Sequence, residues 1–445
     1  MDYCNKKVLV IGLARSGLAA IRVLRQLGAI VFLSEKKEPN EEEKAILASL
    51  DVTIYGQEMS VFEKDYDLVI KNPGVPPVSP IVKRLEERKI PIITEIELAY
   101  DVSMPQHYIA ITGSNGKTTT TSIVYELLKA AYKEKALVGG NIGTPLCELV
   151  LEHDLMHQSG YYISLEISNH QLVDIDRFRP EIAVITNLSP DHLETMGSLE
   201  NYYRSKTEVY RNMKENDLFL LNADDETLQE YTEKYPIHCQ IQRFSLFDQD
   251  SYGHLEDGYM YVGEDKVLPL SAIGLVGRHN QQNVLISIMI AKALHISDEL
   301  IQVTIASFKG VEHRIEFVRE YNGIKYYNDS KGTNVEATMT ALDSFEANVI
   351  LLVGGFEKGL DVKPLREHLG CVKKIIGYGL SGPRIAHDLC DNPIIVEDLA
   401  QAVKEATALA VPGDIVLLSP TTSSFDQYKS YEHRGRHFKE LVNSL

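Results

Sequence analysis

The chain has 445 residues, with 45 lysines and arginines against 63 aspartates and glutamates, and a formal net charge of −18. At about 150 residues per domain, this length predicts roughly three domains rather than one core. The acidic balance argues against a general nucleic-acid binder, because such proteins carry a basic face. It leaves room for an anionic small substrate, since a few lysines in one cleft outweigh a distant acidic surface.

The cysteines and the N-terminal segment indicate the compartment. The five cysteines lie far apart, and no pair has the spacing of a zinc or redox motif, which favours reduced thiols in a reducing compartment. The segment MDYCNKKVLVIGLARSG does not fit a signal peptide, because its short apolar run ends in glycine and arginine. No stretch approaches the roughly 18 apolar residues of a membrane span. We therefore expect a cytoplasmic protein without membrane insertion. The sequence leaves the oligomeric state open, and a monomer is the simplest expectation.

Residues 1–102 alternate short apolar runs with helical patterns, which predicts a Rossmann-like, doubly wound sheet. Ser16 is placed to cap the first helix, and Gly28 is placed to end it. The predicted strands cover residues 8–11, 30–33, 52–55, 68–70 and 92–93.

Residues 103–309 and 310–445 repeat this alternation, so the predicted fold class is α/β with three domains. The central domain is of the P-loop ATPase type, and the C-terminal domain is again Rossmann-like. The central domain also contains a polar, hairpin-rich region at 236–270 and a helix at 280–294. Further strands are predicted at residues 108–112, 161–165, 182–186, 218–221, 349–353, 374–376 and 415–418.

The strongest local motif is TGSNGKTT, which follows the predicted strand 108–112. Glycines free the backbone amides where the strand ends and a helix begins, and such a turn binds phosphate. Lys117 would reach the β- and γ-phosphates of ATP, and the Thr118 hydroxyl would bind Mg²⁺. The loop is a shortened form of the P-loop pattern, because Ile111 stands where that pattern has its first glycine. The predicted ATP-binding residues are Gly113, Ser114, Asn115, Gly116, Lys117, Thr118 and Thr119.

A second glycine-rich turn, GLARSG at residues 12–17, follows the first strand, with Ala14 in place of the middle glycine of the dinucleotide fingerprint. We interpret it as a pyrophosphate site, for which uridine diphosphate and NAD are both candidates. Glu35 ends the second strand, where an NAD enzyme places its ribose-binding acid. It is the main support for a second hypothesis, an NAD-sensing regulator. A structural turn without a ligand is the remaining alternative.

Polar residues follow other predicted strands of the central domain. Glu166, Asp191-His192 and Lys206 suit a Mg²⁺ site shared with phosphate oxygens. Each of them alone is more often a surface or satisfied core residue, but their occurrence after a phosphate loop favours the metal. Asn141 in GGNIG is either a turn residue or a ligand-facing amide.

The third domain carries further polar segments at or beside its strand ends, where open α/β sheets bind ligands. We expect Arg314, Lys331 and Lys358 to meet phosphate or carboxylate, with solvated surface lysines as the alternative. Asn280 and Asn283 would either cap a helix or contact a purine edge. The segments are EHR at 312–314, NDSKGT at 328–333, GGFEKG at 354–359 and SPTTSSF at 419–425.

Taken together and in this order, TGSNGKTT, LEISNHQL, NLSPDHLE, YRSK, GRHNQQN, GVEHR, NDSKGTN and GGFEKG resemble the Mur ligase family. The tail SPTTSSFDQYKSYEHRG resembles that of the members that add D-glutamate. The resemblance implies an ATP-dependent ligase that joins D-glutamate to UDP-N-acetylmuramoyl-L-alanine through an acyl phosphate. It places the reaction in cell-wall precursor synthesis, with a related ligase for another amino acid as the alternative.

The resemblance also implies roles for individual residues. The catalytic residues would be Lys117, Lys206, His192 and Arg314. The metal ligands would be Thr118 and Glu166 for one Mg²⁺ and His192 for a second, with Lys206 carbamylated. The further nucleotide contacts would be Asn280, Asn283, His313, Arg314 and Asp329. The D-glutamate contacts would be Lys331, Thr333, Lys358, Ser424 and Phe425. The uridine-substrate contacts would be Ser16, Lys36, Asn72, Gly74 and Asn141.

Overall fold

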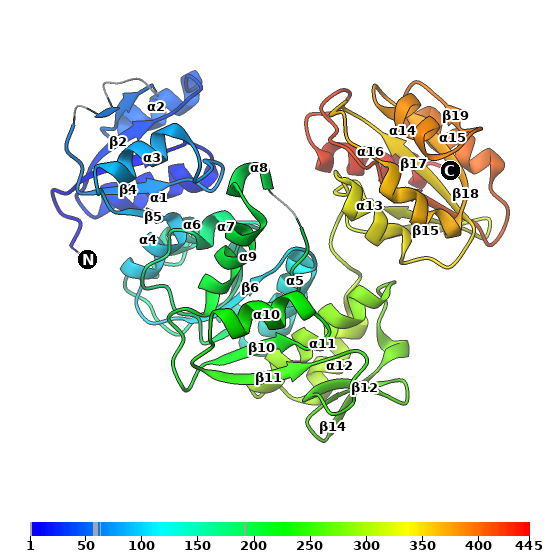
Figure 1. Cartoon of the computed structure of the whole chain (residues 1–445), viewed down its shortest axis with the longest axis horizontal. Coiled ribbons are helices and arrows are strands. Elements are labelled where there is room, and N and C mark those ends of the chain that lie inside the picture. Colours follow the sequence, from blue (N-terminus) through cyan, green and yellow to red (C-terminus); the bar gives the residue numbers. More distant parts are fainter. Residues whose placement is uncertain (1, 57–60, 63, 191–192) are drawn as a thin grey trace. The chain divides into compact units, whose positions relative to one another are not determined.

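The chain forms three separate β-sheets in a computed structural model that describes residues 2–56, 61–62, 64–190 and 193–445 (Figure 1). Two compact units contain them: unit 1 comprises Met1–Ala272 and Gln282–Ile305, and unit 2 comprises Ile273–Gln281 and Ala306–Leu445. The first two sheets lie in unit 1 and the third lies in unit 2. The predicted domain boundaries after residues 102 and 309 fall between sheets, and they stay a prediction.

The first sheet has five parallel strands in the order β3-β2-β1-β4-β5. The central strands β1 and β4 are almost entirely apolar and buried, because helices cover both faces of a doubly wound sheet. The strands are β1 (Lys7–Ile11), β2 (Ile30–Ser34), β3 (Thr53–Tyr55), β4 (Leu68–Lys71) and β5 (Ile92–Thr94). The helices are α1 (Arg15–Gln26), α2 (Glu41–Ser49), α3 (Pro80–Glu87) and α4 (Glu95–Val102).

The second sheet has nine strands in the order β14-β13-β12-β11-β10-β9-β6-β8-β7. Its strands are parallel from β7 to β12, and two antiparallel pairings add β13 and β14 at one edge. The strands are β6 (His107–Thr112), β7 (Ala136–Gly140), β8 (Tyr162–Glu166), β9 (Ile182–Ile185), β10 (Leu218–Asn222), β11 (Gln240–Phe244), β12 (Gly253–Glu256), β13 (Tyr259–Val262) and β14 (Asp265–Pro269). The helices are α5 (Lys117–Tyr132), α6 (Leu146–Glu152), α7 (Asn169–Leu172), α8 (Leu193–Met196), α9 (Leu199–Thr207), α10 (Glu226–Lys234), α11 (Arg278–Ala293) and α12 (Asp298–Ser307), with short 3₁₀ turns at Lys133–Lys135, Glu208–Tyr210 and Leu270–Ala272.

The third sheet has six strands in the order β15-β16-β20-β17-β18-β19, parallel except for the edge pair β15–β16. The strands are β15 (Glu316–Tyr321), β16 (Ile324–Asn328), β17 (Val349–Gly354), β18 (Val372–Tyr378), β19 (Ile394–Ile395) and β20 (Ile415–Leu418). The helices are α13 (Val335–Leu342), α14 (Gly382–Leu389), α15 (Leu399–Leu409) and α16 (Tyr431–Asn443), and a 3₁₀ segment covers Lys363–Cys371.

The strands predicted from apolar runs are confirmed in all three sheets, as are the antiparallel hairpins within 236–270 and the helix at 280–294. The predicted cap of α1 is wrong. The helix begins two residues earlier, at Arg15, and Ala14 takes the cap position. The Ser16 hydroxyl instead accepts a hydrogen bond from Asn72. Gly28 ends α1 as predicted, with the positive φ that glycine tolerates.

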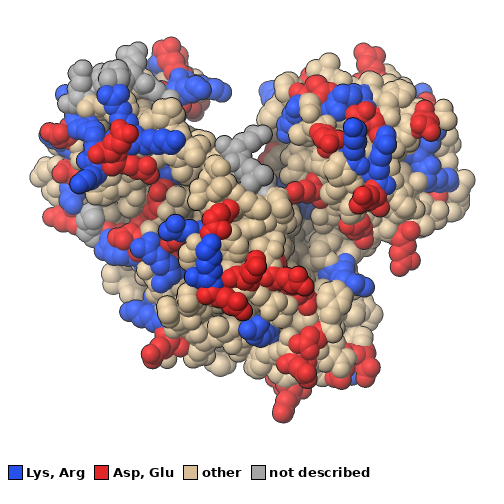
Figure 2. Space-filling view, in the orientation of Figure 1, with Lys and Arg blue, Asp and Glu red and all other residues tan. Residues whose placement is uncertain are grey.

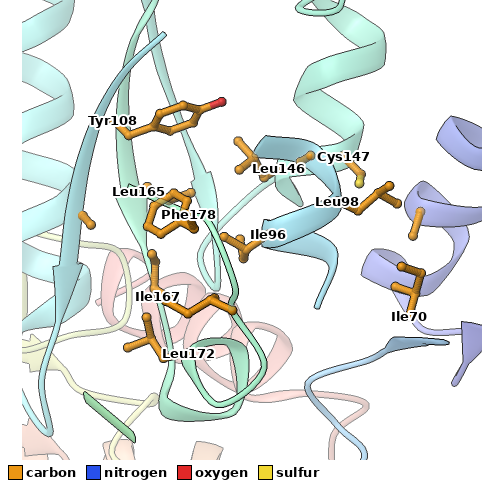
Figure 3. Close-up of a cluster of buried hydrophobic side chains, with 14 of the residues drawn as sticks. Ile70, Ile96, Leu98, Tyr108, Leu146, Cys147, Leu165, Ile167, Leu172 and Phe178 are labelled. Carbon is orange, nitrogen blue, oxygen red and sulfur yellow. The ribbon is translucent and has the colours of Figure 1, made fainter. Parts of the chain in front are cut away.

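One apolar cluster joins the first two sheets within unit 1. Ile70 comes from β4, Ile96 and Leu98 from α4, and Leu146 from α6, and they belong to one buried cluster with Leu165 of β8 and with Phe178, which precedes β9. In Figure 3, Ile96 lies beside Phe178, and Leu98 lies on the side of Ile70. All are buried. The first two sheets therefore share one core, which gives the strand-end loops of both a fixed mutual geometry.

No helix among the described residues is long and apolar enough to cross a membrane. On the face shown in Figure 2, basic and acidic side chains are interspersed within each unit rather than gathered into a basic stripe.

Two carboxylates lie inside the shared core, at the start of α4. Glu97 accepts the backbone N–H groups of Asp176, Arg177 and Phe178 at 2.8–3.0 Å. Glu95 accepts the backbone N–H of Cys147, and its other oxygen has no hydrogen-bond partner in the described part of the chain. Burial raises the pKa of Glu95 to about 7, although the Cys147 hydrogen bond opposes the shift.

This raised pKa predicts how stability depends on pH. Glu95 binds its proton more tightly in the folded chain than in the unfolded chain, so its stabilising contribution is full below about pH 4.5 and is lost as the pH rises through about 7. Glu95→Gln keeps the hydrogen-bond acceptor and cannot ionise. We therefore expect urea unfolding to show that Glu95→Gln gains on the order of 1–3 kcal/mol relative to the wild type between pH 5 and pH 8. Glu87→Gln, on the exposed face of α3, serves as the control and should keep the wild-type slope. Equal slopes for Glu95→Gln and the wild type would contradict the assignment.

Candidate active site

The phosphate loop is a backbone structure packed so closely that two of its glycines have no room for a side chain. A Cβ on Gly113 would lie 2.0 Å from Oγ1 of Thr186, and one on Gly116 would lie 2.5 Å from Oδ1 of Asn283. Both glycines also have positive φ, at 142° and 83°. The loop follows β6 directly and leads into α5, whose cap is Gly116. The predicted strand–loop–helix arrangement is confirmed, and phosphate binding by this loop stays a prediction.

Side chains from the end of β9 hold this loop in place. Thr186 donates its hydroxyl to the carbonyl of Asn115, and Oδ1 of Asn187 accepts the Asn115 N–H at 2.9 Å. The Ser114 hydroxyl donates to the Ser189 carbonyl at 2.9 Å. Asn187 and Ser189 were not singled out in the sequence, because contacts between two strand ends leave no local pattern.

Two lysines converge on the phosphate loop. Nζ of Lys117 lies 2.6 Å from the carbonyl oxygens of Gly113 and Ser114, and Nζ of Lys206 lies 2.9 Å from the same Gly113 oxygen. Lys206 is buried on α9, and its ammonium group lies 4.6 Å from the ring centroid of Tyr202. The structure thus brings Lys117 and Lys206 together, although 89 positions separate them in the sequence (206 − 117). Tyr202 is a further site residue that the sequence did not reveal.

Glu166 ends β8 next to the phosphate loop, because Ile111 of β6 pairs with it in the parallel register. One carboxylate oxygen accepts Nδ2 of Asn141 at 2.7 Å, and the other is buried without a hydrogen-bond partner within the described residues. Asn141 therefore lies against the candidate metal ligand Glu166, and its predicted contact with the uridine substrate stays a prediction. His192 and the adjacent Asp191 lie outside the described residues.

The residues at this edge fit Mg²⁺ rather than a metal held by protein alone. No group of three or more His, Cys, Asp or Glu side chains in the described ranges could hold an ion by itself. Mg²⁺ keeps several waters and takes one or two carboxylates plus substrate phosphates. A buried Glu166 oxygen without a partner, beside a phosphate loop whose Thr118 is also buried, meets that requirement.

A cavity of 590 Å³ lies at the carboxyl ends of β1 and β4 in the first sheet. These two strands flank the point where the strand order reverses, which is where doubly wound sheets bind ligands. The lining includes Gly12, Ala14, Lys36, Asn72 and Gly74. Nδ2 of Asn72 donates to the Ser16 hydroxyl at 2.9 Å, and Oδ1 of Asn72 accepts the Gly74 N–H at 2.9 Å. The predicted substrate residues Ser16, Asn72 and Gly74 are thus brought together.

Glu35 has a structural use in this cavity. Its carboxylate accepts the backbone N–H groups of Leu13 at 2.6 Å, Lys36 at 2.7 Å and Lys37 at 3.1 Å. These bonds tie the β1–α1 turn to the end of β2. The hypothesis of an NAD-sensing regulator rested mainly on Glu35, and the geometry gives that residue a role without NAD.

Unit 2 contains a second set of strand-end loops, which one buried arginine connects. Arg434 on α16 is fully buried, and it donates to Oγ and to the carbonyl of Ser330 at 3.0 and 2.9 Å. It also donates to the carbonyls of Thr422 at 3.1 Å and Gly354 at 3.4 Å. These three acceptors lie in the NDSKGT, SPTTSSF and GGFEKG segments. The prediction of a surface helix at the C-terminus is therefore incomplete, because α16 buries Arg434 between the loops.

All five residues predicted to bind D-glutamate lie in these loops. Nζ of Lys358 lies 3.4 Å from the Thr333 carbonyl, and burial together with the charge of Arg434 lowers the pKa of Lys358. The hydroxyl of Ser424 is buried without a hydrogen-bond partner in the described ranges, and Phe425 is 67% exposed.

Nothing in the sequence indicated an aromatic ring, that of Tyr431, beside these loops. Tyr431, at the start of α16, lies near both Lys331 and His313. Its ring centroid is 5.7 Å from Nζ of Lys331 and 6.1 Å from that of the His313 ring.

The predicted nucleotide residues of unit 2 form a buried polar group. Asp329 accepts the Ser419 hydroxyl at 2.8 Å and the Ile315 N–H at 3.3 Å, and burial raises its pKa to about 7 against the opposing charge of Arg314. Burial and the charge of Arg314 lower the pKa of His279 to about 4, so this imidazole is neutral at pH 7.

The two asparagines predicted to meet adenine differ in their surroundings. Asn280 belongs to unit 2 and donates Nδ2 to the Val276 carbonyl at 2.8 Å. Asn283 belongs to unit 1 and accepts the Thr120 hydroxyl at 3.2 Å, beneath the phosphate loop. Neither caps α11, whose first residue is Arg278. The purine contact stays a prediction.

Comparisons with known proteins identify two domains of the chain and relatives that match it over its full length. Residues 111–291 match the Mur ligase middle domain, and residues 313–422 match the Mur ligase glutamate ligase domain. The UDP-N-acetylmuramoylalanine–D-glutamate ligase of Geobacillus sp. (strain WCH70) is 38% identical over 453 residues, covering 100% of this chain and 98% of the relative. The ligase of the same name from Koribacter versatilis (strain Ellin345) is 40% identical over 455 residues, covering 100% and 99%.

The chain belongs to the Mur ligase family. The fold of this Mur ligase is also similar to that of the UDP-N-acetylmuramate-alanine ligase from Thermotoga maritima, with a TM-score of 0.59 and 20% identity over 99% of this chain and 100% of the other. The predicted fold class is therefore confirmed: a Rossmann-like N-terminal domain, a central ATPase domain and a C-terminal domain, as in other Mur ligases.

The contacts of Arg434 predict a large stability effect in this Mur ligase. Arg434→Lys keeps the charge but cannot reach the same set of acceptors with one point-like ammonium group. Each lost hydrogen bond to a charged group is worth about 1.5–3 kcal/mol, so we expect a destabilisation of about 2–4 kcal/mol by thermal or denaturant unfolding. Arg436 lies two residues further along α16 and is exposed. Arg436→Lys should therefore leave stability within about 0.5 kcal/mol of the wild type. Equal effects of the two substitutions would refute the connecting role of Arg434.

Proposed function

We propose that this chain is the ATP-dependent ligase that joins D-glutamate to UDP-N-acetylmuramoyl-L-alanine in cytoplasmic peptidoglycan precursor synthesis. The observation that carries the proposal is the phosphate loop with Lys117, Lys206 and Glu166 around it, in a chain similar over its full length to ligases named for this reaction. The cavity at β1 and β4 supplies a site for the uridine diphosphate part of the substrate. The loops around Arg434 supply a site for the amino acid.

The chemistry explains why the protein needs both sites. A carboxylate is a poor acyl donor, so its oxygen attacks the γ-phosphorus of ATP. The bond from that phosphorus to the β-phosphate oxygen then breaks, and ADP leaves. The D-glutamate amine then attacks the acyl phosphate, loses a proton and expels phosphate from a tetrahedral intermediate. Holding the amine and the acyl phosphate together is worth up to roughly 7–11 kcal/mol. Water must be excluded, because it would hydrolyse the acyl phosphate.

The charged residues have distinct parts in this proposal. Lys117 neutralises charge on the β- and γ-phosphates, and Arg314 is proposed to stabilise the phosphoryl group in transfer. Mg²⁺, held by Thr118 and Glu166 with a second ion at His192, would add charge neutralisation at the phosphates. Lys331, Thr333, Lys358, Ser424 and Phe425 are proposed to hold D-glutamate, and Asn280, Asn283, His313 and Asp329 to bind the nucleotide.

Phosphate release from ATP tests this function directly. We expect release only when UDP-N-acetylmuramoyl-L-alanine and D-glutamate are both present, because each half-reaction needs its own substrate. A panel of L-glutamate, L-lysine and meso-diaminopimelate should give less than about a hundredth of the D-glutamate rate, since charges and stereochemistry would not match. Lys117→Ala should remove turnover while circular dichroism stays unchanged. Equal rates with a diamino acid would reject D-glutamate in favour of a related ligase, and an active Lys117→Ala would reject the phosphate site.

Lys206 provides a second test, because a lysine buried beside another cation is a candidate for carbamylation. In that reaction the ammonium group loses one proton, the neutral Nζ forms a bond to the carbon of CO₂, and a second proton leaves, so a cation becomes a carbamate anion beside the Gly113 carbonyl. We expect Lys206→Ala to lose at least about a hundredfold in kcat and to recover part of it with millimolar acetate or formate. Carbon-13 NMR with labelled bicarbonate should show a carbamate signal in the wild type alone. No signal and no recovery would refute the modification.

A further inference from the structure

His313 stands in a strained backbone segment that surrounding groups hold in place. Its φ is 66°, a value that residues other than glycine rarely adopt. Its N–H donates to Oε2 of Glu316 at 2.9 Å, and its carbonyl accepts the N–H of Lys331 at 3.0 Å. The ring lies so close to α16 that a Cβ on Gly435 would come within 2.2 Å of Nδ1. Backbone strain of this kind persists only where neighbouring contacts enforce it.

Asn328, the last residue of β16, contacts the same ring. Nδ2 of Asn328 lies 2.9 Å from Nδ1 of His313, 3.0 Å from Oε2 of Glu316 and 3.4 Å from the Gly435 carbonyl. Oδ1 of Asn328 accepts the Ser330 N–H at 3.1 Å. The opposite amide orientation would place Nδ2 against an N–H and Oδ1 against a carboxylate and a carbonyl. The network therefore fixes Nδ2 as the atom that faces His313.

A donor at 2.9 Å requires a lone pair on Nδ1 of His313, so a neutral ring carries its proton on Nε2. Nε2 is buried and has no hydrogen-bond partner in the part of the chain that the structure describes. The nearest charged atom, Oε1 of Glu312, lies 3.7 Å away, beyond hydrogen-bond distance, and Glu312 is paired with Lys439 at 2.6 Å. The Nε2–H group is thus a buried donor held ready for an acceptor.

We propose that Asn328 is a positioning residue that holds His313 as the neutral Nε2–H tautomer, so that His313 donates a hydrogen bond to the bound nucleotide. The acceptor on the ligand is an atom with a lone pair, such as a ring nitrogen of the base or an oxygen of the sugar. The tautomer follows from the network alone, whereas its use by a nucleotide rests on the proposed function. Asn328 had no role in the sequence analysis beyond its place in NDSKGTN.

The charges around the ring decide how the device responds to pH. Three carboxylates favour the protonated ring: Glu312 in the preceding loop, Glu316 on β15 and Glu432 on α16. Burial and the charge of Lys439 oppose it, and burial dominates, so the pKa of His313 is lowered. The wild-type ring therefore loses its extra proton at a lower pH than an ordinary histidine does, and the neutral ring keeps its Nε2–H donor as the pH rises further. A carboxylate in place of the Asn328 amide would raise the pKa of His313 and would accept a proton from Nδ1.

The tautomer can be observed without any ligand. In the full-length protein with nitrogen-15-labelled histidine, we expect His313, identified by the loss of its signals in His313→Gln, to show a protonated Nε2 and an unprotonated Nδ1 at pH 7.5. A protonated Nδ1, or averaging between the two tautomers, would overturn the inference. If the wild type failed to bind ATP at all, the proposed function would fail while this result would still stand.

Asn328→Asp gives a readout that a merely structural role would not produce. At pH 6.5 its imidazolium ring still donates from Nε2, so the KM for ATP should stay within about threefold of the wild type. At pH 9 the ring is neutral with its proton on Nδ1, so Nε2 repels the acceptor and the ratio of variant to wild-type KM should rise at least tenfold, with kcat changed less than threefold. A ratio that does not vary with pH would refute the proposal.

Asn212→Ser is the matched control for loss of a buried amide. Asn212 donates Nδ2 to the carbonyls of Asp176 at 2.9 Å and Phe178 at 3.0 Å, far in sequence from every proposed site residue of unit 2. Its substitution should lower thermal stability and leave the KM for ATP unchanged at both pH values. If Asn212→Ser and Asn328→Asp changed KM alike, general destabilisation would explain both effects and the positioning role would be rejected.

Discussion

The close approach of one backbone segment to its neighbours sets the conditions for the rest of the site. Gly113 leaves no space for a side chain against Thr186, and its carbonyl oxygen accepts from both Lys117 and Lys206. Two ammonium groups at one carbonyl repel each other in a buried setting, and this repulsion is compensated when an anion enters the loop. The geometry therefore concentrates positive potential at one strand end of a chain whose net charge is −18. Conversion of Lys206 into a carbamate would replace this repulsion between two cations by attraction between a cation and an anion.

Unit 2 also carries buried positive charge beside its strand-end loops, in the guanidinium group of Arg434. Its strand-end loops are connected by Arg434, which is buried and bonded to carbonyl and hydroxyl oxygens of separate segments. An arginine suits this task because its planar group donates in several fixed directions and stays charged when buried. Its charge also acts beyond its hydrogen bonds, since it contributes to the lowered pKa of Lys358. Lys358 therefore gives up its proton more readily than an exposed lysine does.

The sequence predicted the sheets and most of the candidate site because both leave local patterns. Buried parallel strands are continuous apolar runs, and phosphate loops need glycine and a helix start at fixed spacing. Residues that act across the fold leave no such pattern. Arg434 was assigned to a surface helix because amphipathic spacing does not reveal which polar residue turns inward. Tyr431 and Asn328 were missed because their partners, Lys331 and His313, are defined only when β16, α16 and the intervening loops pack. Ser16 was predicted to cap α1, but it bonds to Asn72, which directly follows β4 and is distant in the sequence.

Buried polar atoms without partners show how ligand binding and stability are connected. Oε2 of Glu166 in unit 1, and Nε2 of His313 and the hydroxyl of Ser424 in unit 2, are buried, and none has a hydrogen-bond partner among the described residues. Each such atom costs about 1–3 kcal/mol while it stays unsatisfied. Similar atoms occur elsewhere, including the hydroxyls of Tyr66 and Tyr108, so their presence alone does not mark a site. What distinguishes the first group is that each member lies in or beside a segment that is proposed to bind a ligand. A ligand that supplies hydrogen-bond partners to these atoms would recover this cost as binding energy. The unsatisfied atoms thus lower the stability of the free protein and increase its selectivity for a ligand with matching partners.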